Sequence, residues 1–95
     1  MLPAPAAPTN LTLTAVSQSQ INLAWTDNSS NESGFLVEQS LDGINFTLIA
    51  TVGPNVRNWS ATGLRANTRY YFRVRAFNAG GNSAYSNIAN IRTKR

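Results

Sequence analysis

The feature that most constrains this chain is an apolar residue at every second position in several short segments. Leu11 and Leu13 begin the pattern, residues 21–25 continue it, and residues 70–76 carry it furthest. A period of two places successive side chains on opposite faces of a strand, so each segment predicts a strand with one buried face. No segment of the chain has a sustained run of apolar residues at the spacing of three to four positions that is typical of a helix. The chain is therefore predicted to be all-β.

Turn signals divide these segments at intervals of about ten residues. Asp42-Gly43 lies between two apolar runs and predicts a hairpin, because glycine tolerates the positive φ of a tight turn. Polar residues 27–33 and glycine-containing stretches near 53–55 and 79–82 interrupt the chain elsewhere. Seven strands are predicted, over residues 9–16, 20–26, 34–40, 45–52, 57–62, 68–77 and 84–93. Seven short strands with this spacing indicate a sandwich of two sheets.

The same alternation predicts the core, because two facing sheets share an interior only if every second side chain points inward. Trp25 is the largest of these side chains and is expected near the centre. The predicted core consists of Leu11, Leu13, Ile21, Leu23, Trp25, Phe35, Val37, Ile49, Leu64, Tyr70, Phe72, Val74, Ala89 and Ile91.

Three segments resemble the fibronectin type III family. They are Ile-Asn-Leu-Ala-Trp at 21–25, the run Gly-Leu-Arg-Ala-Asn-Thr-Arg-Tyr-Tyr-Phe-Arg-Val-Arg-Ala at 63–76, and Ser-Asn-Ile-Ala-Asn-Ile-Arg-Thr at 86–93. The resemblance covers roughly residues 8–93. It implies a seven-stranded antiparallel sandwich of immunoglobulin-like, fibronectin type III topology, with Trp25, Leu64 and Tyr70 in the core.

Tyr70 has a specific structural role in this interpretation. A tyrosine at the corner that enters the sixth strand can bury its ring and bond its hydroxyl to backbone upstream. Asn67 stands where the family often has glycine, and asparagine also tolerates a left-handed backbone.

The resemblance also suggests a setting. The segments around residues 25–35, 40–43 and 71–76 look like fibronectin type III modules of secreted bacterial enzymes and surface proteins. Residues 1–7 are rich in proline and alanine and are expected to be a linker remnant, with the domain over 8–95. The resemblance therefore implies an extracellular accessory module, whose partners are neighbouring domains or another protein.

Composition argues against catalysis. The chain has no cysteine and no histidine, and its only carboxylates are Asp27, Glu32, Glu38 and Asp42. Acid–base catalysis needs converging ionisable groups, and the plentiful serines have no base to activate them. We therefore expect no enzyme activity and no cofactor.

Nucleic-acid and membrane functions are not indicated either. The net charge of +4 arises from few acids rather than from a run of bases, and the chain shows no RNA-binding motif. No apolar stretch approaches the roughly 20 residues that cross a bilayer.

One acidic pair is a candidate cation site. Asp27 and Glu32 share a polar loop and could hold a hard cation together with backbone oxygens. We favour the simpler interpretation, in which Asp27 stabilises a turn and Glu32 is solvated.

Two surfaces are candidates for protein contacts. The first is formed by the loops at about 27–33, 53–56 and 78–84, because loops on a rigid scaffold often carry recognition. Its candidate residues are Asn28, Ser29, Asn31, Asn55, Asn78 and Asn82.

The second candidate surface is the outer face of the sheet that holds strands three, six and seven. There the alternation directs eight side chains outward: Leu36, Glu38, Tyr71, Arg73, Arg75, Phe77, Ile88 and Arg92. On this face Glu38 is placed to pair with Arg73 or Arg75 across strands. The alternative is an ordinary sheet surface of residues with strong β-propensity.

Two other functions remain as alternatives to the accessory module. One is an engineered binding scaffold that presents the three loops, suggested by a detached single domain. The other is a carbohydrate-binding accessory domain that would bind polysaccharide through Trp59, although the position of Trp59 resembles a part-buried site of the family.

Overall fold

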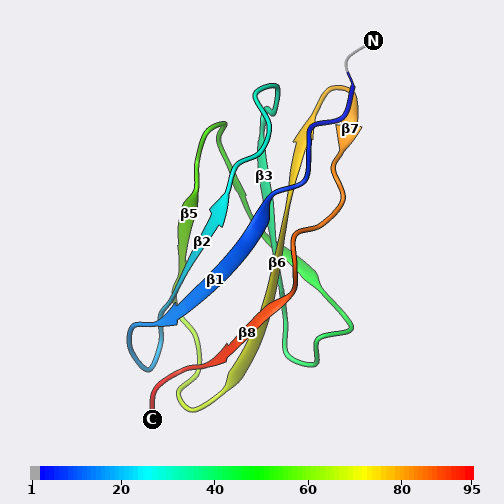
Figure 1. The fold of residues 1–95 in the computed structure, drawn as a ribbon. Coiled ribbons are helices and arrows are strands. Elements are labelled where there is room, and N and C mark those ends of the chain that lie inside the picture. Colours follow the sequence, from blue (N-terminus) through cyan, green and yellow to red (C-terminus); the bar gives the residue numbers. More distant parts are fainter. Residues whose placement is uncertain (1–2) are drawn as a thin grey trace.

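Two antiparallel sheets face each other in the computed structural model, which describes residues 3–95 (Figure 1). The smaller sheet has the strand order β1-β2-β5, with β1 Thr9–Ala15, β2 Ile21–Thr26 and β5 Asn58–Ala61. The larger sheet has the order β4-β3-β6-β7, and β8 also pairs with β6. Its strands are β3 Gly34–Ser40, β4 Thr47–Val52, β6 Arg69–Asn78, β7 Gly81–Asn82 and β8 Ala89–Arg92. The predicted all-β, immunoglobulin-like sandwich is confirmed.

The core lies between the sheets, where the alternation placed it. Phe35, Val37, Phe72 and Val74 are fully buried, and Trp25 is only 4% exposed. The Trp25 and Phe35 rings meet with centroids 5.6 Å apart and planes tilted by 56°. This contact joins β2 of one sheet to β3 of the other, so the indole lies at the centre of the sandwich.

The central residues of the predicted core are buried, but the prediction also included residues that are only partly buried. Five of its members are only partly buried and pack against the core from the edges: Leu13, Ile49, Leu64, Ala89 and Ile91. Two small residues absent from the prediction, Ala61 and Ala76, are buried. Four of these residues lie on the edge strands β1, β4 and β8, which have a neighbour on one side only, and Leu64 lies in the β5–β6 connection, so their inward side chains stay partly open.

The β3–β4 connection is a hairpin, as Asp42-Gly43 predicted. The strands pair antiparallel, and Gly43 has φ +76°. A side chain is disfavoured there by the backbone conformation and also by the Tyr71 ring, which lies 3.2 Å from where a Cβ would be and would have to shift. The loop spans residues 41–46, so β4 begins two residues later than expected.

Tyr70 forms the predicted corner. Its ring is buried, and its hydroxyl oxygen accepts a hydrogen bond of 2.9 Å from the Arg65 backbone N–H. Asn67, at the tip of the same loop, has the expected positive φ of 52°. The bond holds the connection that crosses from the smaller sheet to the larger.

Removing this hydroxyl should cost measurable stability. Tyr70→Phe keeps the ring and leaves the part-buried Arg65 N–H without its acceptor, so we expect a loss of about 1 kcal/mol of unfolding free energy. Urea denaturation followed by tryptophan fluorescence measures the loss. Tyr71→Phe is the matched control, because Tyr71 lies on the outer face and its hydroxyl makes no hydrogen bond within residues 3–95. Equal losses in the two variants would contradict the role assigned to Tyr70.

The last predicted strand, 84–93, is interrupted. The structure has β7 before residue 83 and β8 from residue 89, with an irregular segment between them. In that segment the Ser83 and Ser86 backbone N–H groups donate to β6 carbonyls, while their hydroxyl oxygens accept from the Ala76 and Val74 N–H groups at 2.9 and 3.0 Å. Serine side chains thus replace carbonyl acceptors along β6, and the backbone between them is free to bend outward.

Asn87, in the same segment, joins the two sheets. Its carboxamide accepts from the Leu11 backbone N–H at 2.9 Å and donates to the Leu11 carbonyl at 3.1 Å. These are the two hydrogen bonds that a peptide unit of a neighbouring strand would make with Leu11. The Asn87 side chain therefore pairs the Leu11 backbone N–H and carbonyl at the edge of β1 that faces β8.

Candidate interaction face

The outer face of the larger sheet brings together most of the residues predicted to form an interaction surface. The β3–β6 register sets Glu38 directly opposite Arg73 and Leu36 directly opposite Arg75. Both arginines are half-buried. The register alone therefore places one carboxylate beside two guanidinium groups.

Glu38 is covered, although it points away from the core. It is 7% exposed, and its Oε1 accepts from the Arg73 Nε at 2.8 Å, with the terminal nitrogen of Arg73 also at 2.8 Å. Its Oε2 accepts from the Tyr85 hydroxyl at 2.8 Å, and the nearest Arg75 nitrogen is 4.0 Å away. The predicted cross-strand pair therefore forms with Arg73 at hydrogen-bond distance.

Two aromatic rings enclose the Arg73 guanidinium. Its central carbon lies 4.1 Å from the Phe46 ring centroid and 3.7 Å from that of Tyr85. A planar guanidinium is weakly hydrated and stacks well on aromatic faces. The stack excludes water from Glu38 and strengthens its ion pair with Arg73.

Tyr85 stays in its neutral form at this site. Burial raises the pKa of its phenol, and its hydrogen bond to the Glu38 carboxylate raises that pKa further, against the opposing effect of the two arginines. A neutral phenol can donate the hydrogen bond that Glu38 accepts.

Phe46 and Tyr85 were absent from the predicted face. Both lie outside regular strands, where alternation carries no information about direction. A continuous strand over 84–93 would have placed Tyr85 on the inner side with Ala89 and Ile91. The break formed by Ser83 and Ser86 turns it outward. The signal in the sequence that could have suggested the stack is the Arg73-x-Arg75 alternation of β6, followed closely in the chain by the aromatic residue Tyr85.

The other predicted face residues lie above and below this cluster. Phe77 packs over Gly34, where an added Cβ would meet both the Val52 carbonyl oxygen and the Phe77 ring. Tyr71 is half-buried beneath the β3–β4 loop, and Ile88 is 50% exposed. Arg92 donates to the Asn67 carbonyl at 3.2 Å. The face is thus mixed, with half-buried apolar side chains around arginines.

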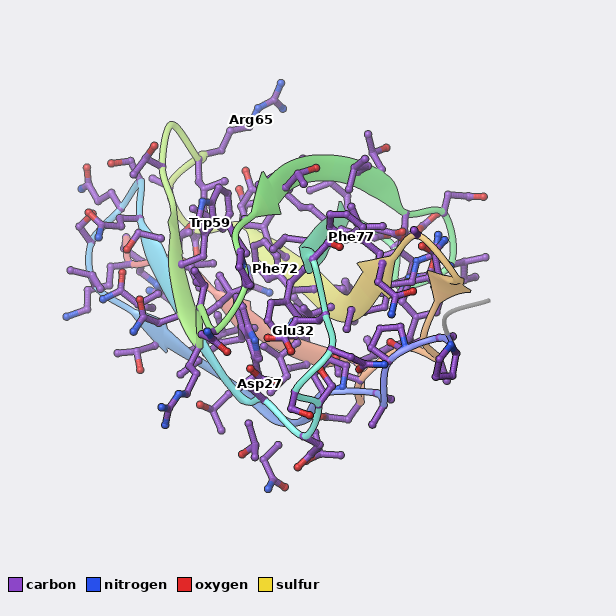
Figure 2. All side chains as sticks on the ribbon, turned by 90° about the horizontal axis from the view of Figure 1, so that it is seen from above. Asp27, Glu32, Trp59, Arg65, Phe72 and Phe77 are labelled. Carbon is purple, nitrogen blue, oxygen red and sulfur yellow. The ribbon has the colours of Figure 1, made fainter. Side chains whose placement is uncertain are left out.

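The loop end of the molecule holds the acidic pair in an internal network. The Ser29 backbone N–H donates to the Asp27 carboxylate at 3.0 Å, and the Ser29 hydroxyl donates to Glu32 at 2.8 Å. The second Glu32 oxygen accepts from the Asn55 backbone N–H at 2.9 Å. Figure 2 shows Asp27 and Glu32 at this end. The expectation that Glu32 is solvated is wrong: it is buried, because it holds one loop to another.

The pKa values of the two carboxyls are shifted in opposite directions. Burial raises the pKa of Asp27 and the Glu32 charge raises it further, although the Ser29 N–H opposes them. Burial would also raise the pKa of Glu32, but the hydrogen bonds from Asn55 and Ser29 outweigh it and lower that pKa. With both Glu32 oxygens so occupied, the arrangement favours a loop-bracing role over a cation site. No group of three or more potential metal ligands occurs within residues 3–95.

Acid is therefore expected to weaken the fold through Glu32. A carboxyl whose pKa is lower in the folded state stabilises the fold above its unfolded-state pKa, and that stability is lost as the pH falls through the folded value. For Glu32 the loss begins near its ordinary pKa of 4.5 and continues below it. Glu32→Gln should lower the unfolding free energy at pH 7 by about 1 kcal/mol and flatten its acid dependence. Urea denaturation between about pH 3 and pH 7 measures both.

Asp27→Asn is the matched comparison. The raised pKa of Asp27 means that its protonation favours the folded state, so the contribution of Asp27 to stability rises as the pH falls. Removing its charge should stabilise the protein slightly at pH 7 and steepen the loss in acid. The hydrogen bonds that lower the pKa of Asp42 persist in both variants. The same pH slope in Glu32→Gln as in the wild type would refute the assignment.

The candidate asparagines of this end hold the N-terminal segment. The Asn78 side-chain amide donates to the Pro3 carbonyl at 2.9 Å and to the Asn31 carbonyl at 3.1 Å. The Asn28 amide donates to the Ala7 carbonyl at 3.0 Å. Pro5, in the predicted linker, is buried, while Met1 and Leu2 lie outside the described residues. Among the candidates within residues 3–95, Asn82 is exposed and lies apart from this network.

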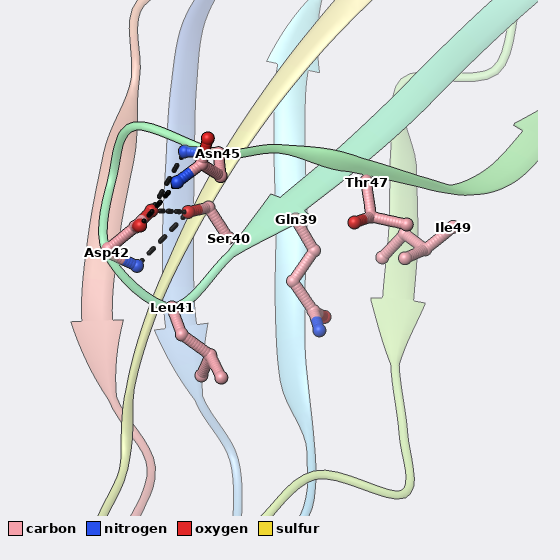
Figure 3. A pocket seen from close by; sticks show the side chains of 7 residues that line it. All are labelled: Gln39, Ser40, Leu41, Asp42, Asn45, Thr47 and Ile49. Carbon is pink, nitrogen blue, oxygen red and sulfur yellow. Dashed lines mark hydrogen bonds between the residues drawn. The ribbon is translucent and has the colours of Figure 1, made fainter.

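The surface depressions are shallow. One of about 440 Å³ lies beside the β3–β4 loop, where the Asp42 carboxylate accepts from Ser40 and from the Asn45 backbone and side chain (Figure 3). Another of about 400 Å³ opens between the sheets, lined by Trp59, Leu64 and Tyr70 among others. Trp59 lies opposite Leu23 and packs against the core, and Figure 2 shows Arg65 pointing away from the molecule. Neither depression gathers charged groups for chemistry.

Comparisons with known proteins agree with this architecture. The chain is 42% identical over 93 residues to chitinase A1 from Niallia circulans, covering 95% of this chain and 12% of the chitinase. It is 36% identical over 75 residues to contactin-6 from Rattus norvegicus, covering 77% of this chain and 7% of the contactin. A structure of titin kinase and its flanking domains superposes with a TM-score of 0.83 at 25% identity, covering 98% of this chain and 18% of that one.

The chain therefore spans a small part of the curated relatives that it matches. The family model that it matches, over residues 6–92, is that of the fibronectin type III domain. This match covers the two sheets, the Trp25–Phe35 contact and the Tyr70 corner described above. The chain belongs to the fibronectin type III domain family.

Proposed function

We propose that this chain is a non-catalytic accessory module that holds its neighbours in a larger extracellular protein at a fixed separation. The observation that carries the proposal is the position of the chain ends. The N-terminal segment lies beside β7 at one end of the molecule, and the residues after β8 lie at the other (Figure 1). The molecule measures 48 × 23 × 19 Å. Domains attached to the two ends would be kept apart along its long axis.

Both ends are held against the domain, which supports a rigid spacer. At one end the Pro3 carbonyl accepts from Asn78, as described above. At the other, the Lys94 backbone N–H donates to the Ser17 carbonyl at 3.3 Å, and the Lys94 carbonyl accepts from the Asn67 N–H at 3.0 Å. A chain fixed at its entry and exit transmits orientation as well as distance.

The relatives support the accessory role. A chitinase and a contactin each carry a matching segment that is a small part of their length. The lack of histidine and cysteine and the scarcity of carboxylates point away from catalysis by this module itself. Within residues 3–95 no helix is long and apolar enough to cross a membrane.

A distance measurement tests the spacer. The chain has no cysteine, so Ala4→Cys and Lys94→Cys provide unique positions for two spin labels. Both positions are exposed. Pulsed electron spin resonance should give one narrow distance distribution. A broad distribution in the wild-type background would overturn the proposal.

Two further variants show whether the asparagine anchor is responsible. Asn78→Ala removes the donor to Pro3 and should broaden the distribution. Asn82→Ala changes an exposed asparagine of the neighbouring strand β7 that lies outside the network, so it should leave the distribution unchanged. Thermal unfolding of each labelled variant confirms that the domain remains folded.

A further inference from the structure

We propose that Arg75 and the side chains around it form a docking surface for a protein segment that presents a carboxylate between apolar residues. We call Leu36, Arg75, Phe77 and Tyr85 the Arg75 patch. This role is separate from the spacing of neighbouring domains and does not depend on it.

Arg75 differs from the other outward-facing arginines of the larger sheet. Arg73 is bound to Glu38, Arg69 donates to the Asn90 side chain, and Arg92 donates to the Asn67 carbonyl. Within residues 3–95 the Arg75 side chain donates no hydrogen bond to any acceptor, and its Nε is buried without a partner. A buried donor left unpaired costs about 1–3 kcal/mol, so this guanidinium has hydrogen-bonding capacity that the chain itself does not meet.

Water can hydrate the Arg75 side chain less completely than the other basic side chains that make no hydrogen bond within residues 3–95. Arg57, Arg65, Lys94 and Arg95 are exposed and can be hydrated on all sides. The Arg75 side chain is 27% exposed, so part of its guanidinium faces protein. A ligand at the exposed part would offer its acceptor to the terminal nitrogens of the guanidinium, since the Nε itself is buried.

Glu38 holds Arg73 by hydrogen bonds and Arg75 only through a longer ion pair. One of its oxygens is taken by Arg73 and the other by the Tyr85 hydroxyl, and the nearest Arg75 nitrogen stays 4.0 Å away. The one carboxylate and two guanidinium groups leave the cluster with an excess positive charge. A second carboxylate, brought by a partner, would complete it.

The guanidinium is also held in place before any partner arrives. Its central carbon lies 4.5 Å from the Tyr85 ring centroid, and Tyr85 is itself fixed by its bond to Glu38. An ordered guanidinium loses less conformational entropy on binding, and its planar fork matches a carboxylate. The stack of Arg73, Tyr85 and Arg75 therefore acts as a preformed anchor.

The surroundings favour a protein segment over a polyanion. Leu36 lies directly opposite Arg75 on β3, and Phe77 lies two residues further along β6. Both are half-buried and leave apolar surface beside the cation. Arginine among aromatic and aliphatic side chains is the composition enriched at protein interfaces. A nucleic acid or sulfated polymer would instead need several free cations in a row.

Two blocked tripeptides test the proposal directly. They are acetyl-Leu-Glu-Phe-amide and its neutral counterpart acetyl-Leu-Gln-Phe-amide, which have the same shape and differ in charge. Each is titrated into the isotope-labelled domain while the Arg75 Nε–H and Leu36 methyl resonances are followed by NMR. We expect saturable shifts at both sites with the glutamate peptide, with a dissociation constant on the order of 1 mM. The glutamine peptide should bind about tenfold more weakly, because it lacks the charge-assisted hydrogen bond.

Variants separate the site from general charge attraction. Arg75→Gln should abolish the preference for the glutamate peptide, whereas Arg69→Gln removes the same charge from an exposed position of the same strand and should preserve it. If Arg75→Gln does not fold, Arg75→Lys keeps the charge without the planar fork and should reduce the preference.

Four results would overturn the proposal. They are equal binding of the two peptides, an equal effect of Arg75→Gln and Arg69→Gln, an undiminished preference in Arg75→Lys, and no shift at about 10 mM peptide. None of them bears on the spin-label distances, so the spacer and the docking surface stand or fall separately.

Discussion

Replacing Trp25 with alanine is expected to remove about 3–5 kcal/mol of unfolding free energy, because it leaves a cavity at the centre of the sandwich. The indole is 4% exposed and packs against Phe35 of the opposite sheet. A domain of this size has about 5–10 kcal/mol in total, so the variant should be only marginally folded at room temperature. Urea denaturation followed by far-ultraviolet circular dichroism measures the change without the tryptophan signal.

Trp25→Phe separates the volume of the indole from its polar group. The Trp25 Nε1 is buried and has no hydrogen-bond partner within residues 3–95. Losing it removes no hydrogen bond, so the cost should come from the smaller ring alone, about 1–2 kcal/mol. If Trp25→Ala and Trp25→Phe proved equally mild, the indole would not be the centre of the core.

Phe72→Ala is expected to cost about 3–5 kcal/mol, while Phe77→Ala on the same strand should cost only about 1 kcal/mol. The two residues are five positions apart on β6, so their rings point to opposite faces of the sheet. Phe72 is fully buried between the sheets, as Figure 2 shows, whereas Phe77 lies half-buried on the outer face over Gly34. The same substitution thus tests burial alone.

Chemical denaturation of the two variants side by side gives the comparison. The denaturant dependence of the free energy should be the same in both, because the surface exposed on unfolding hardly changes. A larger loss for Phe77→Ala than for Phe72→Ala would mean that the alternation of β6 is reversed, and the two-sheet assignment would fail with it.

Most of the fold follows from short-range regularity. The period of two in residues 21–25 and 70–76 is a property of the strand itself, so it identified both the strands and the side chains that face the core. The pairing of Glu38 with Arg73 was predictable for the same reason, since two adjacent strands with known faces leave few possible neighbours. Tyr70 and its upstream partner were predictable from a motif that the family shares.

The sequence by itself determined the all-β class, the central core and the positive φ of Gly43 and Asn67, because each depends on local backbone geometry or on alternation within one strand. Only the tertiary structure decided where strand pairing stops and what covers Glu38. Ser83 and Ser86 could interrupt the last strand because β6 lay beside them, and its backbone N–H groups donate to their hydroxyl oxygens in place of carbonyls. That break turned Tyr85 outward onto the Arg73 and Arg75 guanidinium groups, and contacts between residues so distant in sequence exist only once the sheets have formed.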